Sequence, residues 1–265
     1  NGAMIGHRDA GRGTLRVRRV QGLDGLASLR EAWRTLHPHC RVYARHEWHD
    51  AVARHFVGDE RALAWLHVLD GDRTVGVLPA IADREPLRGF GTRRVLGAGR
   101  HRLLNLVDAP LAPQADPAAV AAALDRALAD QGGWFALRWP RIQSSGRLAA
   151  LAQVWPGGRA RIVAAGSGCN WLTLQPSAEA TRRALPRSLA QNLRTAANRL
   201  ARAGIAEWDE RATPAAYEEF LALEASGWKG AHGSASAAGL LAGGRGFFGA
   251  LLAAGDADWR PSLTL

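Results

Sequence analysis

Lysine is almost missing from this 265-residue chain: among its 34 lysine and arginine residues, only Lys229 is a lysine. Cysteine is nearly as scarce, and the two residues, Cys40 and Cys169, can form neither a disulfide framework nor the paired spacing of a zinc site. No apolar run approaches the roughly 18 residues of a membrane span, and no secretory signal is visible. We therefore expect a cytoplasmic protein without a membrane span.

Several catalytic signatures are also absent. The chain has no G-x-S-x-G elbow, no Walker loop and no H-E-x-x-H, which argues against a hydrolase, a P-loop ATPase and a metalloprotease. One short stretch gathers His37, His39, Cys40, His46 and His49, a composition that suggests a metal site. A zinc site needs closing ligands at a defined spacing, and none is evident. We interpret these five as ordinary polar residues and expect no metal.

Basic residues outnumber acidic residues in this chain. The net charge is +10 and 47% of the residues are hydrophobic, which is typical of a globular protein that could bind an anionic partner. The arginines are spread along the chain, however, and nearly replace lysine. This pattern reflects the base composition of the source genome more readily than a dedicated nucleic-acid surface.

The first half of the chain alternates strand and helix patterns. Residues 70–72, Asp-Gly-Asp, predict a hairpin between two apolar strands, and Asp116 and Pro117 predict the start of a helix that ends at glycines 132 and 133. We expect an α/β unit with a mixed sheet. Its elements are a strand at 15–21, helices at 26–39 and 47–56, two strands within 62–82, a strand that runs into a loop within 92–113, a helix at 116–133 and a strand at 134–142.

The second half begins with an apolar stretch at 160–174 and continues with two helices that Pro186 separates. In the longer helix, one face carries Leu189, Leu193, Ala196 and Leu200, and the opposite face carries Arg187, Gln191, Arg194 and Asn198. Strands are expected at 206–212 and 259–265, with helices at 214–228 and 237–255. Because the chain stops on the β-rich "PSLTL", we expect it to be truncated at its C-terminus.

Three segments resemble the GNAT-superfamily acyltransferases of the CelD type, which are associated with cellulose biosynthesis and related to the FemAB aminoacyltransferases. They are "SLAQNLRTAANRLARAG", "FLALEASGWKGAHGSA" and "FFGALLAAG". The first half agrees more loosely through "YARHEWHDAVARHF", "TVGVLPA" and "NLVDAPL". The resemblance implies two tandem GNAT-like units with mixed sheets flanked by helices, at 15–158 and 159–265 after a tag and flexible leader at 1–14, the second unit being incomplete.

The same resemblance implies a bacterial N-acyltransferase that takes an acyl group from acetyl-CoA or another acyl-CoA. The acceptor would be an amine on a small molecule or saccharide, in cell-envelope or polysaccharide biosynthesis. Three alternatives stay open: a FemAB-like transferase that uses aminoacyl-tRNA, a non-catalytic GNAT-fold assembly module, and a nucleic-acid-binding protein. The loss of the family's remaining pyrophosphate-binding elements beyond Leu265 would leave this chain inactive or weakly binding.

Lys229 stands between Trp228 and Gly230 at the end of an expected helix, where the backbone can approach a ligand closely. An ammonium can meet a phosphate or carboxylate, or act as a base once buried. It can equally complete a helix C-terminus at the surface. The resemblance favours ligand contact, with Lys229 as a catalytic candidate and Trp228 as a substrate-binding one.

Asp108, in "NLVDAP", is the second catalytic candidate, because a carboxylate could orient or deprotonate the amine acceptor. It could also cap a turn before Pro110. "RVLGAG" matches the R-x-x-G-x-G pattern of GNAT pyrophosphate loops through Arg94, Gly97 and Gly99, our cofactor-binding candidates. The apolar segment after it does not predict a helix, so the match is also explained by the abundance of glycine.

Arg187 and Arg194 are the remaining substrate-binding candidates, because a row of guanidinium groups could bind phosphates or an aminoacyl-tRNA. The alternative is a solvated helix face.

Overall fold

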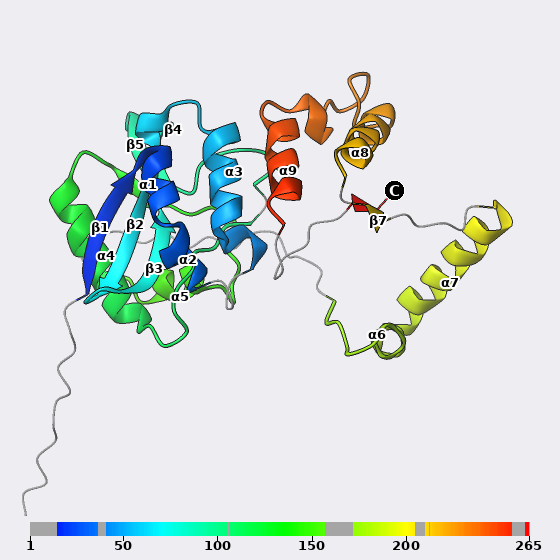
Figure 1. Cartoon of the computed structure of the whole chain (residues 1–265), viewed down its shortest axis with the longest axis horizontal. Coiled ribbons are helices and arrows are strands. Elements are labelled where there is room, and N and C mark those ends of the chain that lie inside the picture. Colours follow the sequence, from blue (N-terminus) through cyan, green and yellow to red (C-terminus); the bar gives the residue numbers. More distant parts are fainter. Residues whose placement is uncertain are drawn as a thin grey trace, which may run out of the picture. The chain divides into compact units, whose positions relative to one another are not determined.

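The computed structural model describes residues 15–36, 41–104, 106–156, 172–204, 210–211, 213–255 and 263–264 (Figure 1). The chain divides into two compact units: Asn1–Val163 with Leu221–Pro261, and Ala164–Phe220 with Ser262–Leu265. The expected boundary at 158/159, the leader at 1–14 and both cysteines lie outside the described residues. The expected α/β class is confirmed, because small sheets alternate with helices along the chain.

The first sheet is antiparallel and has the order β1-β2-β3. Its strands are β1 (Arg16–Gln21), β2 (Ala64–Asp70) and β3 (Arg73–Pro79). The predicted hairpin joins β2 to β3 at Gly71, whose φ of 61° is a conformation that glycine adopts without strain. All but the last residue of β2 are buried, so this strand is the centre of the unit.

The second sheet has the order β4-β5-β6 and is mixed, because β4 and β5 are antiparallel while β5 and β6 are parallel. Its strands are β4 (Ile81–Leu87), β5 (Gly91–Gly97) and β6 (Ala136–Arg138). The sequence analysis does not anticipate β4. Its letters, IADREPL, include three charged residues and a proline, which obscure the usual strand pattern.

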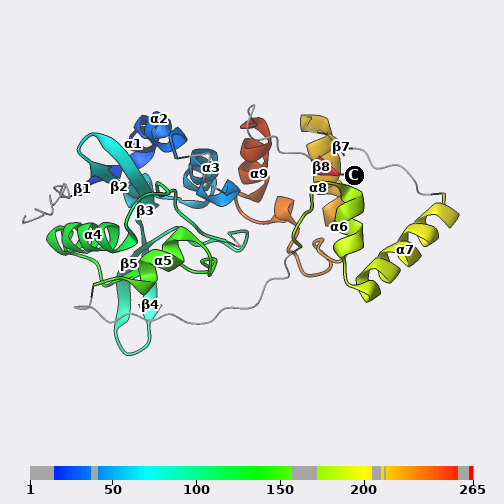
Figure 2. The same cartoon turned by 90° about the horizontal axis from the view of Figure 1, so that it is seen from below.

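Helices cover both faces of the first sheet. Ala64, Leu66 and Val68 of β2 belong to one core cluster with residues of α4, whereas Trp65 belongs to a second cluster with residues of α1, α3 and α9. Successive side chains of a strand point to opposite faces of the sheet, so neighbouring residues of β2 belong to different core clusters. The helices are α1 (Gly22–Ser28), α2 (Arg30–Arg34), α3 (His46–Phe56), α4 (Pro117–Gln131), α5 (Arg147–Gln153) and α9 (Gly244–Ala253), with 3-10 turns η2 (Val42–Ala44), η3 (Glu60–Ala62) and η4 (Ala238–Leu240) (Figure 2).

The ends of α4 follow the sequence signals. The Asp116 side chain accepts a hydrogen bond from the Ala118 N–H at 3.0 Å, and Gly132 ends the helix with a φ of 58°. Helix α5 is not anticipated, because its seven residues are too short for a clear periodic pattern.

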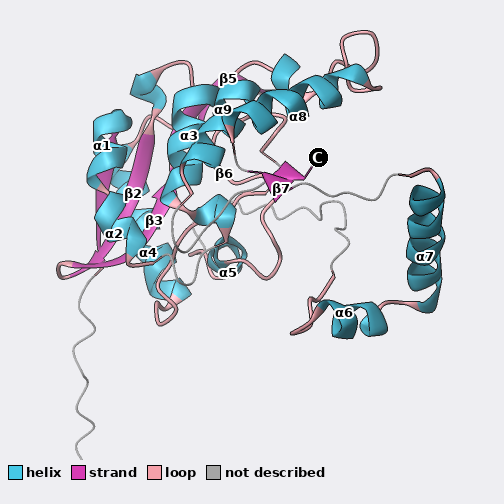
Figure 3. Ribbon diagram, turned by 45° about the vertical axis from the view of Figure 1, so that its right-hand side comes forward, coloured by secondary structure: helices cyan, strands magenta, loops and turns pink. Residues whose placement is uncertain are grey.

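The second unit contains α6 (Ala178–Ala184), α7 (Arg187–Arg202) and the two-stranded pair of β7 (Glu210–Arg211) and β8 (Leu263–Thr264) (Figure 3). Pro186 separates α6 from α7 as predicted. Helix α8 (Pro214–Ser226) begins in this unit and enters the first unit at Leu221. Within the described ranges, no helix is long and apolar enough to cross a membrane.

Candidate functional site

Asp108 lies on a loop that is bonded along the edge of β3. The Val77 N–H donates to the Pro110 carbonyl at 3.1 Å, and the Ala112 N–H donates to the Val75 carbonyl at 2.8 Å. A side chain at Gly76 would collide with Leu111, since a Cβ there would lie 2.2 Å from Leu111 Cδ2. Glycine in β3 therefore allows the loop to pack closely enough to bury Asp108.

The Asp108 carboxylate is 7% exposed and is held by backbone amides. Its Oδ1 accepts hydrogen bonds from the Ala109 N–H at 3.0 Å and from the Leu148 N–H at 3.2 Å. Its Oδ2 lies 3.0 Å from the position that a Cβ at Gly146 would occupy. These two bonds hold the Asp108 carboxyl group in a fixed position beside the start of α5.

A cavity of about 110 Å³ adjoins this carboxylate. Two arginines and a serine line the cavity together with Asp108, so the lining includes both acidic and basic residues. Since a water molecule takes about 30 Å³ of liquid, the space holds about four waters or a group of a few heavy atoms. Its lining residues are Arg41, Ala44, Asp108, Ala109, Leu111, Ser145, Gly146 and Arg147.

Gln143 ties the two sides of this cavity together. Its Oε1 accepts hydrogen bonds from the Arg41 guanidinium and from the Tyr43 hydroxyl, the latter at 3.1 Å. The Gly146 N–H in turn donates to the Gln143 carbonyl at 2.8 Å, which closes the turn before α5. The η2 segment and the 143–146 turn are therefore held against each other across 100 positions of sequence.

His49 of α3 lies behind this site in the core. It is 3% exposed, and its ring centroid lies 5.0 Å from that of Trp33. Burial, together with the nearby His46, lowers the pKa of His49 to about 3, although the backbone carbonyls of Tyr43 and Asp108 act in the opposite direction. Neither ring nitrogen has a hydrogen-bond partner of normal geometry among the described residues. The imidazole is therefore neutral at physiological pH.

Lys229 is engaged by a carboxylate in the same unit. Its Nζ lies 2.9 Å from Glu224 Oε1, and Glu224 Oε2 accepts the Ala238 N–H at 2.8 Å. Burial opposes ionisation of Glu224, but the hydrogen bonds from Lys229 and Ala238 and the Lys229 charge outweigh it, so the pKa of Glu224 lies below its ordinary value. Glu224 thus links the end of α8 both to Lys229 and to the first residue of η4.

The backbone around Lys229 is tightly folded. Its carbonyl accepts the N–H groups of both Ser236 and Ala237 at 3.0 Å, and a Cβ at Gly230 would lie 2.0 Å from the Ala225 carbonyl oxygen. Trp228, in contrast, is 73% exposed, with the Lys229 ammonium 5.8 Å from its ring centroid. The structure thus gives Lys229 a role in shaping this loop and leaves the Trp228 ring open to solvent.

The R-x-x-G-x-G segment lies on β5 and just beyond it. Gly97 pairs with Arg138 of β6, and a Cβ at Gly97 would lie 2.2 Å from the Arg138 carbonyl oxygen. Gly99 has a φ of 85°, and the next residues form a loop, not a helix. The structure therefore uses Gly97 for close pairing of strands, and the segment lacks the helix N-terminus that usually binds a pyrophosphate.

The predicted site residues fall into separate groups. Trp228 and Lys229 are adjacent, and Arg94 and Gly97 lie on β5 with Gly99 just beyond it. Within the described chain, Asp108 makes no hydrogen bond or ion pair to any of these residues. Arg187 and Arg194 lie on α7 in the second unit, and both are exposed.

A metal site is not seen in the described part of the chain, where no three His, Cys, Asp or Glu side chains form a group that could hold an ion. His37, His39 and Cys40 lie outside it. His46 is instead a core residue that hydrogen-bonds the Leu26 carbonyl at 3.1 Å and packs edge-on against Trp33.

Most of the residues that surround Asp108 are not predicted from the sequence: Arg41, Tyr43, Gln143, Ser145 and Arg147. One available signal was "QSSGR" at 143–147, a turn-forming stretch directly before the apolar residues of α5. Nothing in the sequence indicates that this turn meets residues 41–44, because the contact depends on the tertiary fold.

Comparisons with known proteins identify no family. No family model matches the chain, and no curated protein does. Among solved structures, an aminoglycoside acetyltransferase from an uncultured soil metagenomic sample, in complex with sisomicin, covers 59% of this chain and 97% of its own at 10% identity and a TM-score of 0.34. An integron cassette protein from the mobile metagenome of Cole Harbour Salt Marsh covers 62% of this chain and 98% of its own at 13% identity and a TM-score of 0.31.

Proposed function

We propose that the protein is an N-acyltransferase that binds its amine acceptor at the Asp108 cavity. The observation that carries the proposal is the buried Asp108 carboxylate, whose Oδ1 is held by two backbone amides beside a small cavity. A positioned carboxylate attracts an ammonium group and accepts its hydrogen bonds. The family resemblance supplies the donor, acetyl-CoA or another acyl-CoA, and the reaction needs no metal.

The step we propose forms a C–N bond and breaks a C–S bond. The bound ammonium first loses a proton to water, and the neutral amine attacks the thioester carbonyl. The attached nitrogen then becomes strongly acidic, and its proton passes to Asp108 directly or through water. The thiolate of coenzyme A then leaves and takes up a proton. Arg41 and Arg147 place positive charge beside the same cavity, where it would stabilise the developing oxyanion.

The other candidate residues have supporting places in this proposal. Trp228 offers an exposed ring to a substrate or donor group, and Lys229 acts as a positioning residue that holds the loop through Glu224. Arg94, Gly97 and Gly99 remain our proposal for donor contact. The acceptor class is an amine on a small molecule or saccharide.

Release of free thiol from a panel of acyl-CoA thioesters, each with a panel of primary amines, tests the proposal. Asp108→Asn keeps an oxygen for the Ala109 and Leu148 amides but removes the charge, and we expect it to lower kcat by roughly 10²–10⁴-fold. Asp72→Asn, on an exposed hairpin, is the matched control. No amine-dependent thiol release from any pair would contradict the proposal, and binding of aminoacyl-tRNA instead of acyl-CoA would favour the FemAB-like alternative.

A further inference from the structure

We propose that α7 is a docking face for an anionic lipid surface. The inference is independent of the acyltransferase proposal, because it rests on a different unit of the chain. It starts from the exposure of the helix: of its 16 residues, only Ala190 is even partly buried. Figures 1 and 3 show α7 as a single regular helix.

The apolar side chains of α7 form one continuous face. Leu189, Leu193 and Leu200 are 43%, 51% and 37% exposed. At 3.6 residues per turn they share one face, and Ala196 lies among them. Exposed leucines gathered in this way mark an interaction surface, whereas single exposed leucines do not.

The charge on α7 has one sign only. Its sequence, RSLAQNLRTAANRLAR, contains four arginines and no aspartate or glutamate. By the helical period, Arg199 lies nearest the leucine face, while Arg187, Arg194 and Arg202 lie on the opposite side of the helix. Long arginine side chains can extend from the polar side toward phosphate groups while the leucines enter the acyl-chain boundary.

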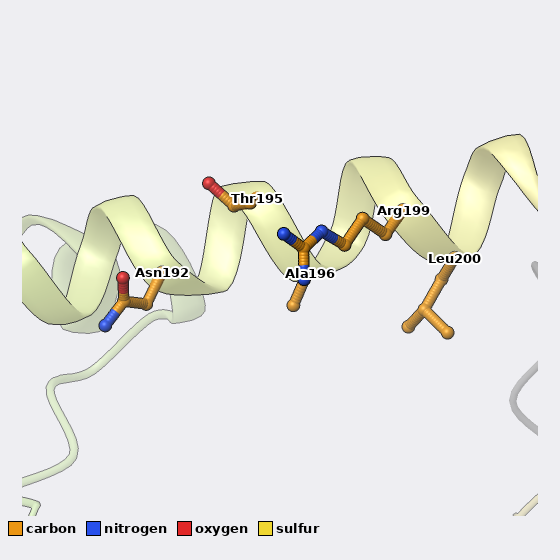
Figure 4. A pocket seen from close by; sticks show the side chains of 5 residues that line it. All are labelled: Asn192, Thr195, Ala196, Arg199 and Leu200. Carbon is orange, nitrogen blue, oxygen red and sulfur yellow. The ribbon is translucent and has the colours of Figure 1, made fainter.

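In the described part of the chain, the hollow on the surface of α7 is formed by this helix alone. Figure 4 shows Asn192, Thr195, Ala196, Arg199 and Leu200 along it, and every described residue that lines this hollow belongs to α7 itself. A one-helix surface with an apolar face and an arginine-rich polar side matches the arrangement of interfacial amphipathic helices.

Two other occupants fit less well. A nucleic acid would use the arginines but would leave the leucine face without a function, because phosphate contacts supply its affinity. A second copy of α7 would place arginines near arginines without a carboxylate in either helix to pair with them. Of these three occupants, an anionic bilayer satisfies both the apolar face and the charge.

Co-sedimentation with vesicles tests the proposal, using phosphatidylcholine alone and a 3:1 mixture of phosphatidylcholine and phosphatidylglycerol. We expect the whole chain to bind the anionic vesicles, and Leu193→Gln or Arg194→Glu each to weaken the binding roughly tenfold. Leu223→Gln, at an exposed leucine of α8, and Arg126→Glu, at an exposed arginine of α4, are matched controls that should bind normally.

Three results would overturn the proposal. The first is equal binding of Leu193→Gln and wild type to anionic vesicles, or no binding by either. The second is retention on RNA that Arg194→Glu abolishes and Leu193→Gln leaves unchanged. The third is a dimer in solution, without vesicle binding, that Leu193→Gln converts to monomer. Leu189→Gln repeats the apolar test at a second position, and circular dichroism checks that each variant keeps its helix content.

Discussion

The Oδ1 atom of Asp108 accepts a hydrogen bond from the Leu148 N–H, 40 positions later in the chain, at 3.2 Å. This bond fixes the start of α5 against the loop beside β3. We therefore expect the hydrogen-bond acceptor at Asp108 Oδ1 to contribute more to the stability of the fold than the negative charge of the side chain does. We expect Asp108→Ala to lower the free energy of unfolding by about 1–3 kcal/mol, because a buried donor loses its acceptor.

Asp108→Asn should cost less, since its carbonyl oxygen can take the place of Oδ1. Urea denaturation of both variants measures the difference. Equal losses for alanine and asparagine would show that the two amide bonds do not hold the carboxylate in place.

Glu224 is expected to contribute more to stability than its partner Lys229. The Lys229 side chain is 40% exposed, so loss of the pair in Lys229→Met should cost under about 1 kcal/mol. Glu224→Ala also removes the acceptor for the Ala238 N–H and should cost about 1–2 kcal/mol. Thermal unfolding of the two variants and the double variant measures the coupling, with the exposed Glu179→Ala as control.

A cost for Lys229→Met that exceeds that of Glu224→Ala would contradict this account of the loop. The pH dependence gives a further check. Because the pKa of Glu224 is lowered in the folded state, its contribution is present above about pH 4.5 and is lost as the pH falls further.

His49 should make the protein less stable in mild acid. Its pKa is about 3 in the folded protein against 6.5 in the unfolded chain, so the unfolded state binds the additional proton between these values. The free energy of unfolding should therefore have its full value above about pH 6.5, and His49 should lower it by up to about 1.4 kcal/mol for each pH unit below that.

His49→Leu removes one titrating group and should reduce the slope between pH 6.5 and 4.5, where His46, His67 and His101, whose pKa values burial also lowers, still contribute. Denaturant midpoints across that range compare the two proteins, with exposed His232→Leu as control. A slope that is unchanged in His49→Leu would mean that another group controls the acid sensitivity.

Local sequence signals predict the helices and strands of this chain better than the tertiary contacts between them. The β2–β3 hairpin, the Asp116 cap of α4 and the break at Pro186 each depend on neighbouring residues, and the structure contains all three. Strand β4 is not predicted because its charged residues obscure the strand pattern, and helix α5 is not predicted because it is too short for a clear helical pattern. The surroundings of Asp108 are not predicted for another reason: residues 41–44 and 143–147 are about 100 positions apart, and only the tertiary structure brings them into contact.

Gly243 is expected to be required where α9 begins. It has a φ of 74°, and a Cβ there would lie 2.0 Å from the His55 carbonyl oxygen of α3. Gly243→Ala should therefore cost about 2 kcal/mol or more, through backbone strain and separation of α3 from α9. Gly58→Ala has open space around the new methyl group and serves as the control. Chemical denaturation that ranks the two variants equally would contradict the close packing of α9.

The most direct test of the Asp108 site is amide NMR of the labelled protein during titration with primary amines that act as acceptors. The account predicts that the shifts concentrate at the amides of Ala109, Ser145, Gly146 and Leu148, and that Asp108→Asn removes them while Asp72→Asn does not. Shifts that lie elsewhere, or that persist in Asp108→Asn, would contradict binding of the amine at this carboxylate.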